Sequence, residues 1–336
     1  MTIDLASSDL VHLFVQEFRL CRVQPGECVL LFTDPAFPHP NYPPAAFAAA
    51  KVLGAAPYLL TVSSENQLVG PLCRQAWRDA DLVVGMSTVP RGIGSWMYTE
   101  TSDQALAGGT RILMVQEPLG ALRRMTPDPT VIAVTRAGAE RMEQASEMRV
   151  VSEAGSDFTL SKAGRPAHAQ WGVADQPGRW DHWPSGLVAC APLEHSANGV
   201  YVIAPGDVLL GHRRHASSRI ELTLRDGMVT EITGGTDAQL LEDHLRAAGD
   251  EGAYRLAHAG WGTDHRADWS AIGMDSESLS GSVMVSLGRN LFDAPAPFSG
   301  LAGANSSESH YDICCRRASL WLDGVLVVDR GQLLSL

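Results

Sequence analysis

A histidine and a carboxylate lie two residues apart near the end of the chain, at His310 and Asp312 in residues 309–313. The segment has the composition of a β-strand. Because residues i and i+2 of a strand share a face, the two side chains emerge roughly 6 to 7 Å apart and can bind one metal ion. His258, in the apolar and glycine-terminated residues 254–262, supplies a second imidazole. Two histidines and one carboxylate favour non-haem iron(II), written Fe(2+).

Three protein ligands on one face of an octahedral ion leave about three positions for substrate and dioxygen. The pattern His-x-Asp is weak by itself, since a hydrogen-bonded pair in a strand has the same spacing. His265 is the rival for the second histidine, although it lies beyond the glycine turn, and Glu308 shares the strand face of His310 as a reserve ligand or base. Asp264 and His265 are candidates to orient the His258 ring, because ligand histidines usually donate their other N–H to such a group.

The length, charge and composition of the chain limit the kinds of molecule that it is expected to bind. The 336 residues can bury a large core and suggest two domains. The net charge is −12 and no run of Lys or Arg forms a stripe, which argues against a nucleic acid or an anionic membrane as partner. The first five residues carry no basic region, and no apolar stretch approaches the length of a membrane span. We therefore expect a cytoplasmic protein that acts on a small molecule.

Six cysteines are scattered along the chain without any Cys-x-x-Cys pair, which argues against a zinc knuckle or a redox dithiol. We expect reduced thiols. Cys314 and Cys315 follow the predicted ligands directly, but neighbouring strand residues face opposite sides, so packing is favoured over metal binding.

The first 150 residues alternate helical and strand patterns in the manner of a parallel α/β layer. No glycine-rich phosphate loop follows the first predicted strand, so a dinucleotide is not expected. The predicted strands are residues 28–33, 57–62, 81–85 and 111–115, and the predicted helices are residues 8–21, 43–53, 70–80, 101–107 and 137–148.

From about residue 149 the pattern changes to alternating residues and hairpin turns, which is typical of antiparallel strands. Asp226-Gly227 and Asp323-Gly324 each lie between two alternating runs and predict tight turns with positive φ angles. An amphipathic helix at residues 237–248 leads into the strand of His258. We predict an α/β domain at residues 1–150 with a parallel sheet, and an α+β domain at residues 151–336, rich in antiparallel strands, that carries the metal site.

Five segments of the second half resemble the thermophilic, aminopeptidase T-like metallopeptidases and the related 2,5-dihydroxypyridine 5,6-dioxygenases. They are residues 151–159, 183–188, 197–199, 258–262 and 310–312. In the peptidase branch two glutamates and a histidine at three further places complete a two-metal site, whereas this chain has Leu187, His258 and Met284 there. Losing these ligands disfavours a paired hydrolytic site.

The dioxygenase branch implies one iron(II) held by His258, His310 and Asp312. Its substrate is a dihydroxypyridine whose ring nitrogen and adjacent oxygen occupy two iron positions, and the ring opens between carbons 5 and 6 to an N-formylmaleamate-type product. The resemblance, together with the sheet edges, also implies a homo-oligomer. Assigning this substrate here is inference from the resemblance, and a carboxylated or benzenoid hydroxy-aromatic remains an alternative.

The dioxygenase branch carries an acid–base histidine in the loop that corresponds to residues 95–100, and this chain has none there. Tyr98 or Glu100 are the candidates to handle protons in its place, since either can do so once its pKa is adjusted. His182, in Trp180-Asp181-His182-Trp183, is a candidate to hydrogen-bond the substrate, and the alternative is a histidine packed between tryptophans.

Three classes of function remain open at this point. The leading one is an iron(II)-dependent ring-opening dioxygenase, which uses an aromatic substrate and O2. The second is a metal-dependent hydrolase of the same fold, an aminopeptidase or an aromatic deaminase, which metal analysis and oxygen consumption distinguish from the first. The third is a non-catalytic binding protein, for which the three polar residues are only structural and no stoichiometric metal is expected.

Overall fold

The computed structural model describes residues 5–90, 94–291 and 298–335. Their contacts divide the chain into two compact units. The first, here called the α/β unit, comprises the described parts of Met1–Asp128, Gln170–Pro184 and Asp293–Ser299. The second, here called the antiparallel unit, comprises those of Pro129–Ala169, Ser185–Phe292 and Gly300–Leu336.

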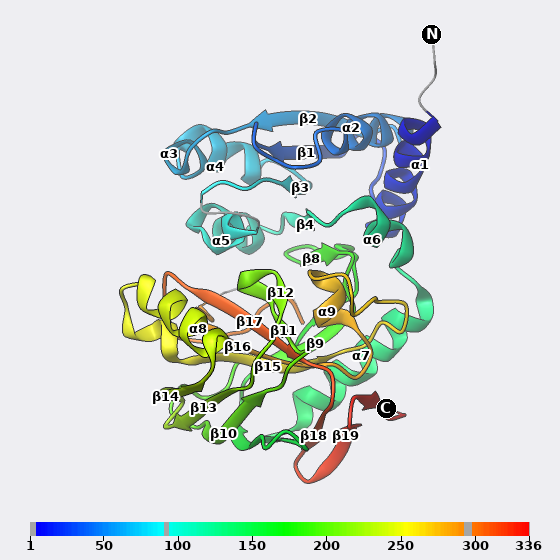
Figure 1. Ribbon diagram of the computed structural model, residues 1–336. Helices are drawn as coiled ribbons and strands as arrows, with labels where there is room; N and C mark the ends of the chain where they lie inside the picture. Colours follow the sequence, from blue (N-terminus) through cyan, green and yellow to red (C-terminus); the bar gives the residue numbers. More distant parts are fainter. Residues whose placement is uncertain (1–4, 91–93, 292–297, 336) are drawn as a thin grey trace. The chain divides into compact units, whose positions relative to one another are not determined.

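A five-stranded parallel sheet forms the α/β unit, in the order β2-β1-β3-β4-β8 (Figure 1). Most of β1 is buried, as expected for a continuous apolar run in a parallel sheet, and α2 packs against β1 and β2. Strand β8 pairs with β4 and brings a distant part of the chain into this sheet. The elements are α1 (Leu5–Leu20), β1 (Cys28–Thr33), α2 (Tyr42–Val52), β2 (Ala56–Thr61), α3 (Glu65–Leu68), α4 (Pro71–Arg78), β3 (Leu82–Met86), η1 (Ser95–Tyr98), α5 (Glu100–Ala107), β4 (Arg111–Val115), α6 (Leu119–Arg124) and β8 (Trp180–Trp183).

Two sheets form the antiparallel unit: an eight-stranded sheet, β14-β13-β10-β6-β5-β18-β19-β20, and a seven-stranded sheet, β12-β11-β17-β16-β15-β9-β7. The elements are α7 (Pro129–Gln144), β5 (Glu147–Ser152), β6 (Asp157–Ser161), β7 (His168–Gln170), β9 (Leu187–Cys190), β10 (Asn198–Ile203), β11 (Val208–Leu209), η2 (Leu210–His212), β12 (Arg214–His215), β13 (Ile220–Arg225), β14 (Met228–Gly234), α8 (Thr236–Ala247), η3 (Glu251–Tyr254), β15 (Leu256–Gly262), α9 (Met274–Ser278), β16 (Val283–Gly288), β17 (His310–Cys315), β18 (Ala318–Leu322), β19 (Val325–Asp329) and β20 (Gln332–Leu333).

The two sheets of the antiparallel unit meet through one face of β17. Cys315 of β17 contacts Tyr201 of β10, with 3.0 Å between the thiol sulfur and the phenol oxygen, and both side chains are buried. Since side chains alternate along a strand, residues 311, 313 and 315 share the face toward the eight-stranded sheet. His310 and Asp312 therefore lie on the opposite face of the seven-stranded sheet.

The predicted fold class is confirmed at the level of a parallel α/β region followed by antiparallel sheets. Both hairpin predictions are confirmed as well: Asp226 and Gly227 have φ of 48° and 76°, and Asp323 and Gly324 have φ of 47° and 78°. All six cysteines are free, as expected, and Cys314 and Cys315 are buried.

The helix predicted at residues 137–148 is wrong in its position, because α7 spans Pro129–Gln144 and β5 already begins at Glu147. The β-branched residues at the beginning of α7 have a low helix propensity, so the sequence pattern does not indicate a helix there. Val131, Thr135, Ala139 and Met142 are nevertheless buried at helical spacing.

The proposed domain boundary near residue 150 remains a prediction. The two compact units have other bounds than this prediction. The chain leaves the α/β unit after Asp128 and returns to it for residues 170–184. Helix α7 thereby belongs to the antiparallel unit, where it packs against β9.

Candidate metal centre

Three side-chain donor atoms converge on one face of the seven-stranded sheet. The Nε2 atoms of His258 and His310 each lie 3.2 Å from Oδ1 of Asp312, and the two Nε2 atoms are 3.3 Å apart. This is the only group of three or more potential metal donors from His, Cys, Asp and Glu in the described part of the chain. The spacing expected from the strand periodicity therefore does bring His310 and Asp312 together, and His258 joins them.

The register of three neighbouring strands explains this convergence. In the central strand β16, Ser286 lies opposite His258 of β15 and opposite Asp312 of β17. The small Ser286 therefore lies between His258 and Asp312, and it leaves room for these two longer side chains to approach each other. A register shift between Leu256 and His258 marks an irregularity in β15, and such a bulge redirects the side chain that follows it.

Each histidine has a second hydrogen-bond partner that orients its ring. His310 Nδ1 lies 2.7 Å from the carbonyl oxygen of Arg289, so Nδ1 carries a hydrogen and donates it. Ser286 Oγ donates to Asp312 Oδ1 and lies 3.4 Å from His258 Nδ1. Metal-binding histidines are commonly held in this way, with the remaining ring nitrogen directed at the ion.

Burial and mutual charge shift the pKa values of the three groups in different directions. Burial lowers the pKa of His258, although Asp312 partly opposes this shift. Burial also acts to lower the pKa of His310, but the charge and hydrogen bond of Asp312 outweigh it and raise the pKa. Burial acts to raise the pKa of Asp312, but the two histidines hold it well below its ordinary value. The carboxylate is therefore ionised.

The three donors fit a small divalent cation. Two Nε2 lone pairs and a carboxylate oxygen this close repel one another unless a proton or a metal cation lies among them. With metal–ligand bonds of about 2.1 Å, neighbouring ligands lie about 3.0 Å apart in an octahedral site and about 3.4 Å apart in a tetrahedral one. The observed spacings of 3.2 and 3.3 Å lie between these values. The spacing alone thus supports a metal but does not select its identity.

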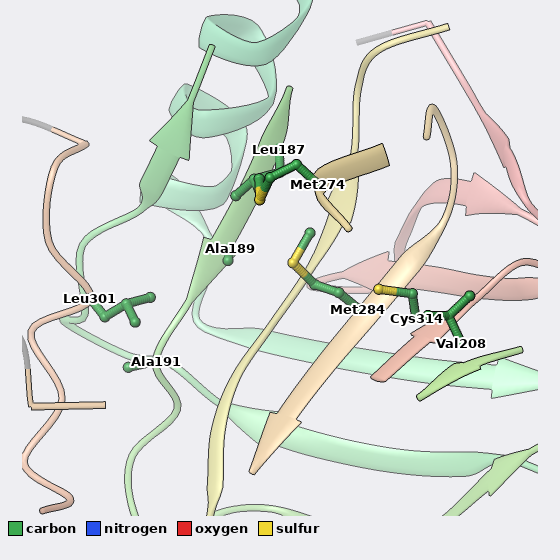
Figure 2. Close-up of a cluster of buried hydrophobic side chains, with 8 residues drawn as sticks. All are labelled: Leu187, Ala189, Ala191, Val208, Met274, Met284, Leu301 and Cys314. Carbon is green, nitrogen blue, oxygen red and sulfur yellow. The ribbon is translucent and has the colours of Figure 1, made fainter. Parts of the chain in front are cut away.

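An apolar cluster continues the same face of the sheet. Figure 2 shows its eight buried side chains, which are Leu187, Ala189, Ala191, Val208, Met274, Met284, Leu301 and Cys314. In one row across the sheet, Ala189, Gly260, Met284 and Cys314 lie opposite one another in turn. Leu187 and Met284, at the places where the resemblance implies metal ligands in the peptidase branch, both belong to this cluster. The cluster offers no carboxylate or imidazole to a second ion, which argues against a paired hydrolytic site.

The residues predicted to handle protons or substrate belong to the α/β unit. Tyr98 ends η1 and is partly buried. Glu100 begins α5, and its exposed carboxylate pairs with Arg74 at 3.1 Å and accepts a hydrogen bond from Gln104. His182 is buried in β8, next to Met114 of β4, and burial lowers its pKa to about 3. Its Nε2 has no hydrogen-bond partner among the described residues. The roles of these three residues remain predictions.

The alternative ligands lie elsewhere in the antiparallel unit. His265 and Glu308 are exposed and do not belong to the group of converging donors. Asp264 is buried, but both of its oxygens accept hydrogen bonds from Arg266, at 2.9 and 2.7 Å. The expectation that Asp264 or His265 orients His258 is therefore wrong, because the hydroxyl of Ser286 is the group that lies beside its Nδ1.

Sequence reasoning did not identify Ser286 or the carbonyl of Arg289. A backbone carbonyl leaves no trace in a residue type. A serine inside the apolar residues 283–288 is a weak signal, although strand periodicity does place it on the face of Met284.

Comparison with known proteins places the chain among the dioxygenases. A curated 2,5-dihydroxypyridine 5,6-dioxygenase of Pseudomonas putida (strain KT2440) is 31% identical over 357 residues, which cover 98% of this chain and 97% of the relative. The family model described as NicX, 2,5-dihydroxypyridine 5,6-dioxygenase, matches residues 9–335. The chain belongs to this family.

Two solved structures resemble the fold. The 2,5-dihydroxypyridine dioxygenase from Pseudomonas putida KT2440 superimposes with a TM-score of 0.87 at 29% identity, covering 98% of both chains. AmpT from Thermus thermophilus has a TM-score of 0.66 at 14% identity, covering 98% of this chain and 99% of that one, and so shares the fold. None of the helices that the structure describes is both long and hydrophobic enough to traverse a bilayer.

Proposed function

We propose that this protein is an iron(II)-dependent dioxygenase that opens the ring of 2,5-dihydroxypyridine or a closely related hydroxylated aromatic. The observation that carries the proposal is the convergence of His258 Nε2, His310 Nε2 and Asp312 Oδ1 within 3.3 Å of one another, in a chain of the dioxygenase family. Two histidines and one carboxylate that bind a single face are the ligand set of non-haem iron(II) oxygenases.

When bound by these three donors, iron(II) would supply open positions for a chelating substrate and for dioxygen. The chain's own residues keep the donor atoms in place. The Arg289 carbonyl accepts from His310 Nδ1, and the Ser286 hydroxyl donates to Asp312. The proposed overall reaction adds both atoms of O2 to the ring as the bond between carbons 5 and 6 breaks, so no further reductant is needed.

An apolar cluster adjoins the donors and gives them apolar surroundings. Its side chains, drawn in Figure 2, have little or no exposed surface. Strand pairing places Met284 and Cys314 on the face that carries Asp312. Apolar surroundings exclude water and strengthen charge interactions at the donor atoms.

Proton transfer is proposed for Tyr98 or Glu100, and hydrogen bonding to the substrate for His182. Since burial lowers the pKa of His182 to about 3, its imidazole is neutral at pH 7 and suits hydrogen bonding better than proton abstraction. We also propose that the protein works in the cytoplasm. We propose further that it is a homo-oligomer, and light scattering after gel filtration tests this oligomeric state directly.

The test of the function is oxygen consumption by protein purified anaerobically and loaded with iron(II). With 2,5-dihydroxypyridine we expect uptake of one O2 per ring and loss of the ultraviolet band of the substrate. Asp312→Ala should abolish both while the circular dichroism spectrum stays unchanged, and Ser282→Ala serves as the control. Benzenoid and carboxylated diols assayed in parallel define the substrate.

Two outcomes would count against the proposal. If the Asp312→Ala protein kept full activity, these residues would not be the ligands. If the wild-type protein bound zinc or manganese tightly, consumed no oxygen and released amino acids or ammonia, a hydrolase of the same fold would be the better description.

A further inference from the structure

Ser286 occupies the centre of the three-strand row that carries two of the three donors. It lies opposite both His258 and Asp312, and its side chain is fully buried. The other residues of β16 are apolar or glycine, and all of them are buried. A hydroxyl in such a strand needs hydrogen-bond partners, because an unpaired buried hydroxyl destabilises the fold.

The hydrogen-bonding capacity of a serine fixes which atom donates. A hydroxyl has one hydrogen and two lone pairs, whereas an ionised carboxylate can only accept. The hydroxyl hydrogen of Ser286 is therefore directed at Asp312 Oδ1, and an oxygen lone pair is left for His258 Nδ1 at 3.4 Å. This arrangement favours the tautomer of His258 that carries its hydrogen on Nδ1. The Nε2 lone pair is then available on the side of Asp312 and His310.

His310 does not depend on this hydroxyl. Its Nδ1 lies 2.7 Å from the carbonyl oxygen of Arg289, a backbone group that a side-chain substitution leaves in place. A change at Ser286 should therefore affect the His258 ring and the Asp312 carboxylate while the His310 ring keeps its orientation. This asymmetry distinguishes a specific role from general damage to the strand.

We propose that Ser286 is a positioning residue of the metal centre, which sets the tautomer of His258 and holds Asp312 through one hydroxyl. The inference rests on the proposed function, because it assumes that the three donors bind a metal. It goes beyond the ligand set by assigning the affinity of the centre partly to a residue that does not bind the metal itself.

Metal affinity of three variants tests the proposal. Ser286→Ala removes the hydroxyl, Ser286→Thr keeps it, and Ser282→Ala removes another buried hydroxyl near β16 whose Oγ donates to the Ser276 carbonyl at 3.0 Å. Anaerobic equilibrium dialysis with Fe(II) and with Co(II) measures the dissociation constants. We expect Ser286→Ala to weaken binding by about 10- to 100-fold, the usual loss when an outer partner of a ligand is removed. Ser286→Thr and Ser282→Ala should each stay within about threefold of wild type.

A second readout does not use the loaded protein. Nitrogen-15 spectra of the imidazoles in chelator-treated samples report which ring nitrogen carries the hydrogen. Ser286→Ala should move His258 toward a mixture of tautomers, while the signals of His310 keep the Nδ1–H pattern. A purely structural serine would leave the His258 tautomer unchanged.

The possible outcomes distinguish failure of the positioning role of Ser286 from failure of the proposed metal centre. If wild type and Ser286→Ala bind metal equally well and show the same His258 tautomer, the positioning role is wrong and the metal centre stands. If Ser286→Thr is as weak as Ser286→Ala, the hydroxyl is not what matters, and the positioning role is again wrong. If wild type itself binds neither Fe(II) nor Co(II), the proposed metal centre fails.

Discussion

Two of the three donor residues follow from the sequence by strand geometry alone. His310 and Asp312 share a face because they are two residues apart, and the structure places them 3.2 Å apart at their donor atoms. His258 is a different case, since its position depends on how β15, β16 and β17 pair across more than 50 residues of chain. Local patterns do not fix such a register, so the sequence proposed His258 but left His265 open as a rival, and the family resemblance favoured His258. Ser286 was missed because a single serine in an apolar run also fits an ordinary core position.

Asp312→Asn isolates the charge of the carboxylate from its shape. The amide has the same size, but it brings no negative charge to the two imidazoles, so a divalent cation loses its main electrostatic attraction. Loss of a hydrogen-bond partner of a metal ligand lowers metal affinity by about 10- to 100-fold. We expect Asp312→Asn to lower the affinity for Fe(II) and Co(II) by more than this. Isothermal titration with Co(II) measures this loss.

Asp207→Asn is the control for this prediction. Asp207 is also a buried carboxylate of the antiparallel unit, and it accepts from the backbone N–H groups of Ala204 and Arg316. This variant should lose stability but keep metal affinity. Equal losses of affinity in both variants would mean that burial of charge in general, and not Asp312, controls the site.

We expect the contribution of His182 to the free energy of unfolding to depend on pH in the acid range. Its pKa is lowered to about 3 in the folded chain, against about 6.5 in an unfolded one, so the unfolded state binds more protons below pH 6.5. The free energy of unfolding from this group should therefore fall by about 1.4 kcal/mol per pH unit as the pH drops below 6.5, or about 2 kcal/mol at pH 5. Urea unfolding at pH 7 and pH 5 should show a smaller loss in His182→Leu than in wild type.

The matched control for this measurement is His195→Gln, which changes an exposed histidine. It should lose as much stability as wild type between the two pH values. Buried carboxyls with raised pKa values, such as Asp181, shift stability in the opposite direction, but they are common to all three proteins. An unchanged slope in His182→Leu would show that His182 does not titrate in this way.

Individual elements were predictable where local chemistry determines them. The strand at residues 28–33 and the strand at residues 111–115 match β1 and β4, because continuous apolar runs of this length suit buried parallel strands. The two Asp-Gly turns match as well, since glycine readily adopts the positive φ they need. The position of α7 was missed because burial against β9, and not the local propensity of its β-branched residues, stabilises that helix.

The two hairpins provide a matched pair of glycine substitutions. Gly227 and Gly324 have nearly equal φ, 76° and 78°. A Cβ at Gly324 meets nothing within 4 Å, whereas a Cβ at Gly227 would lie 1.9 Å from the carbonyl oxygen of Glu194. Gly324→Ala should cost only the conformational strain, about 1–2 kcal/mol. Gly227→Ala should cost about 1–3 kcal/mol more, because the loop of Glu194 must move.

Urea unfolding followed by circular dichroism measures both costs. Equal destabilisation by the two alanines would contradict the close approach of the Glu194 carbonyl to the turn at Gly227. Gly324→Ala should leave metal affinity unaltered, since Gly324 lies in the turn between β18 and β19 and not in the row of β15, β16 and β17.

At the scale of the whole molecule, the sequence indicates two regions but not the path between them. The pattern changes from α/β to antiparallel near residue 149, yet the chain crosses between units at Asp128 and again around residues 170–184. Nothing local marks β8 as a strand of the parallel sheet, because its pairing with β4 is a long-range contact. The three donors lie in the antiparallel unit, and Tyr98, Glu100 and His182 lie in the α/β unit.

Metal binding should therefore stabilise one unit more than the other. A ligand that binds only the folded state stabilises it by about 2.7 kcal/mol at 100 times its dissociation constant. Since the donors come from β15 and β17, added Co(II) should slow hydrogen exchange in β15, β16 and β17 and leave exchange in β1 and β3 nearly unchanged. Asp312→Ala should show no such protection. Equal protection of both sheets on Co(II) binding would mean that the two units open together, and protection confined to β1 and β3 would place the metal outside the donors described.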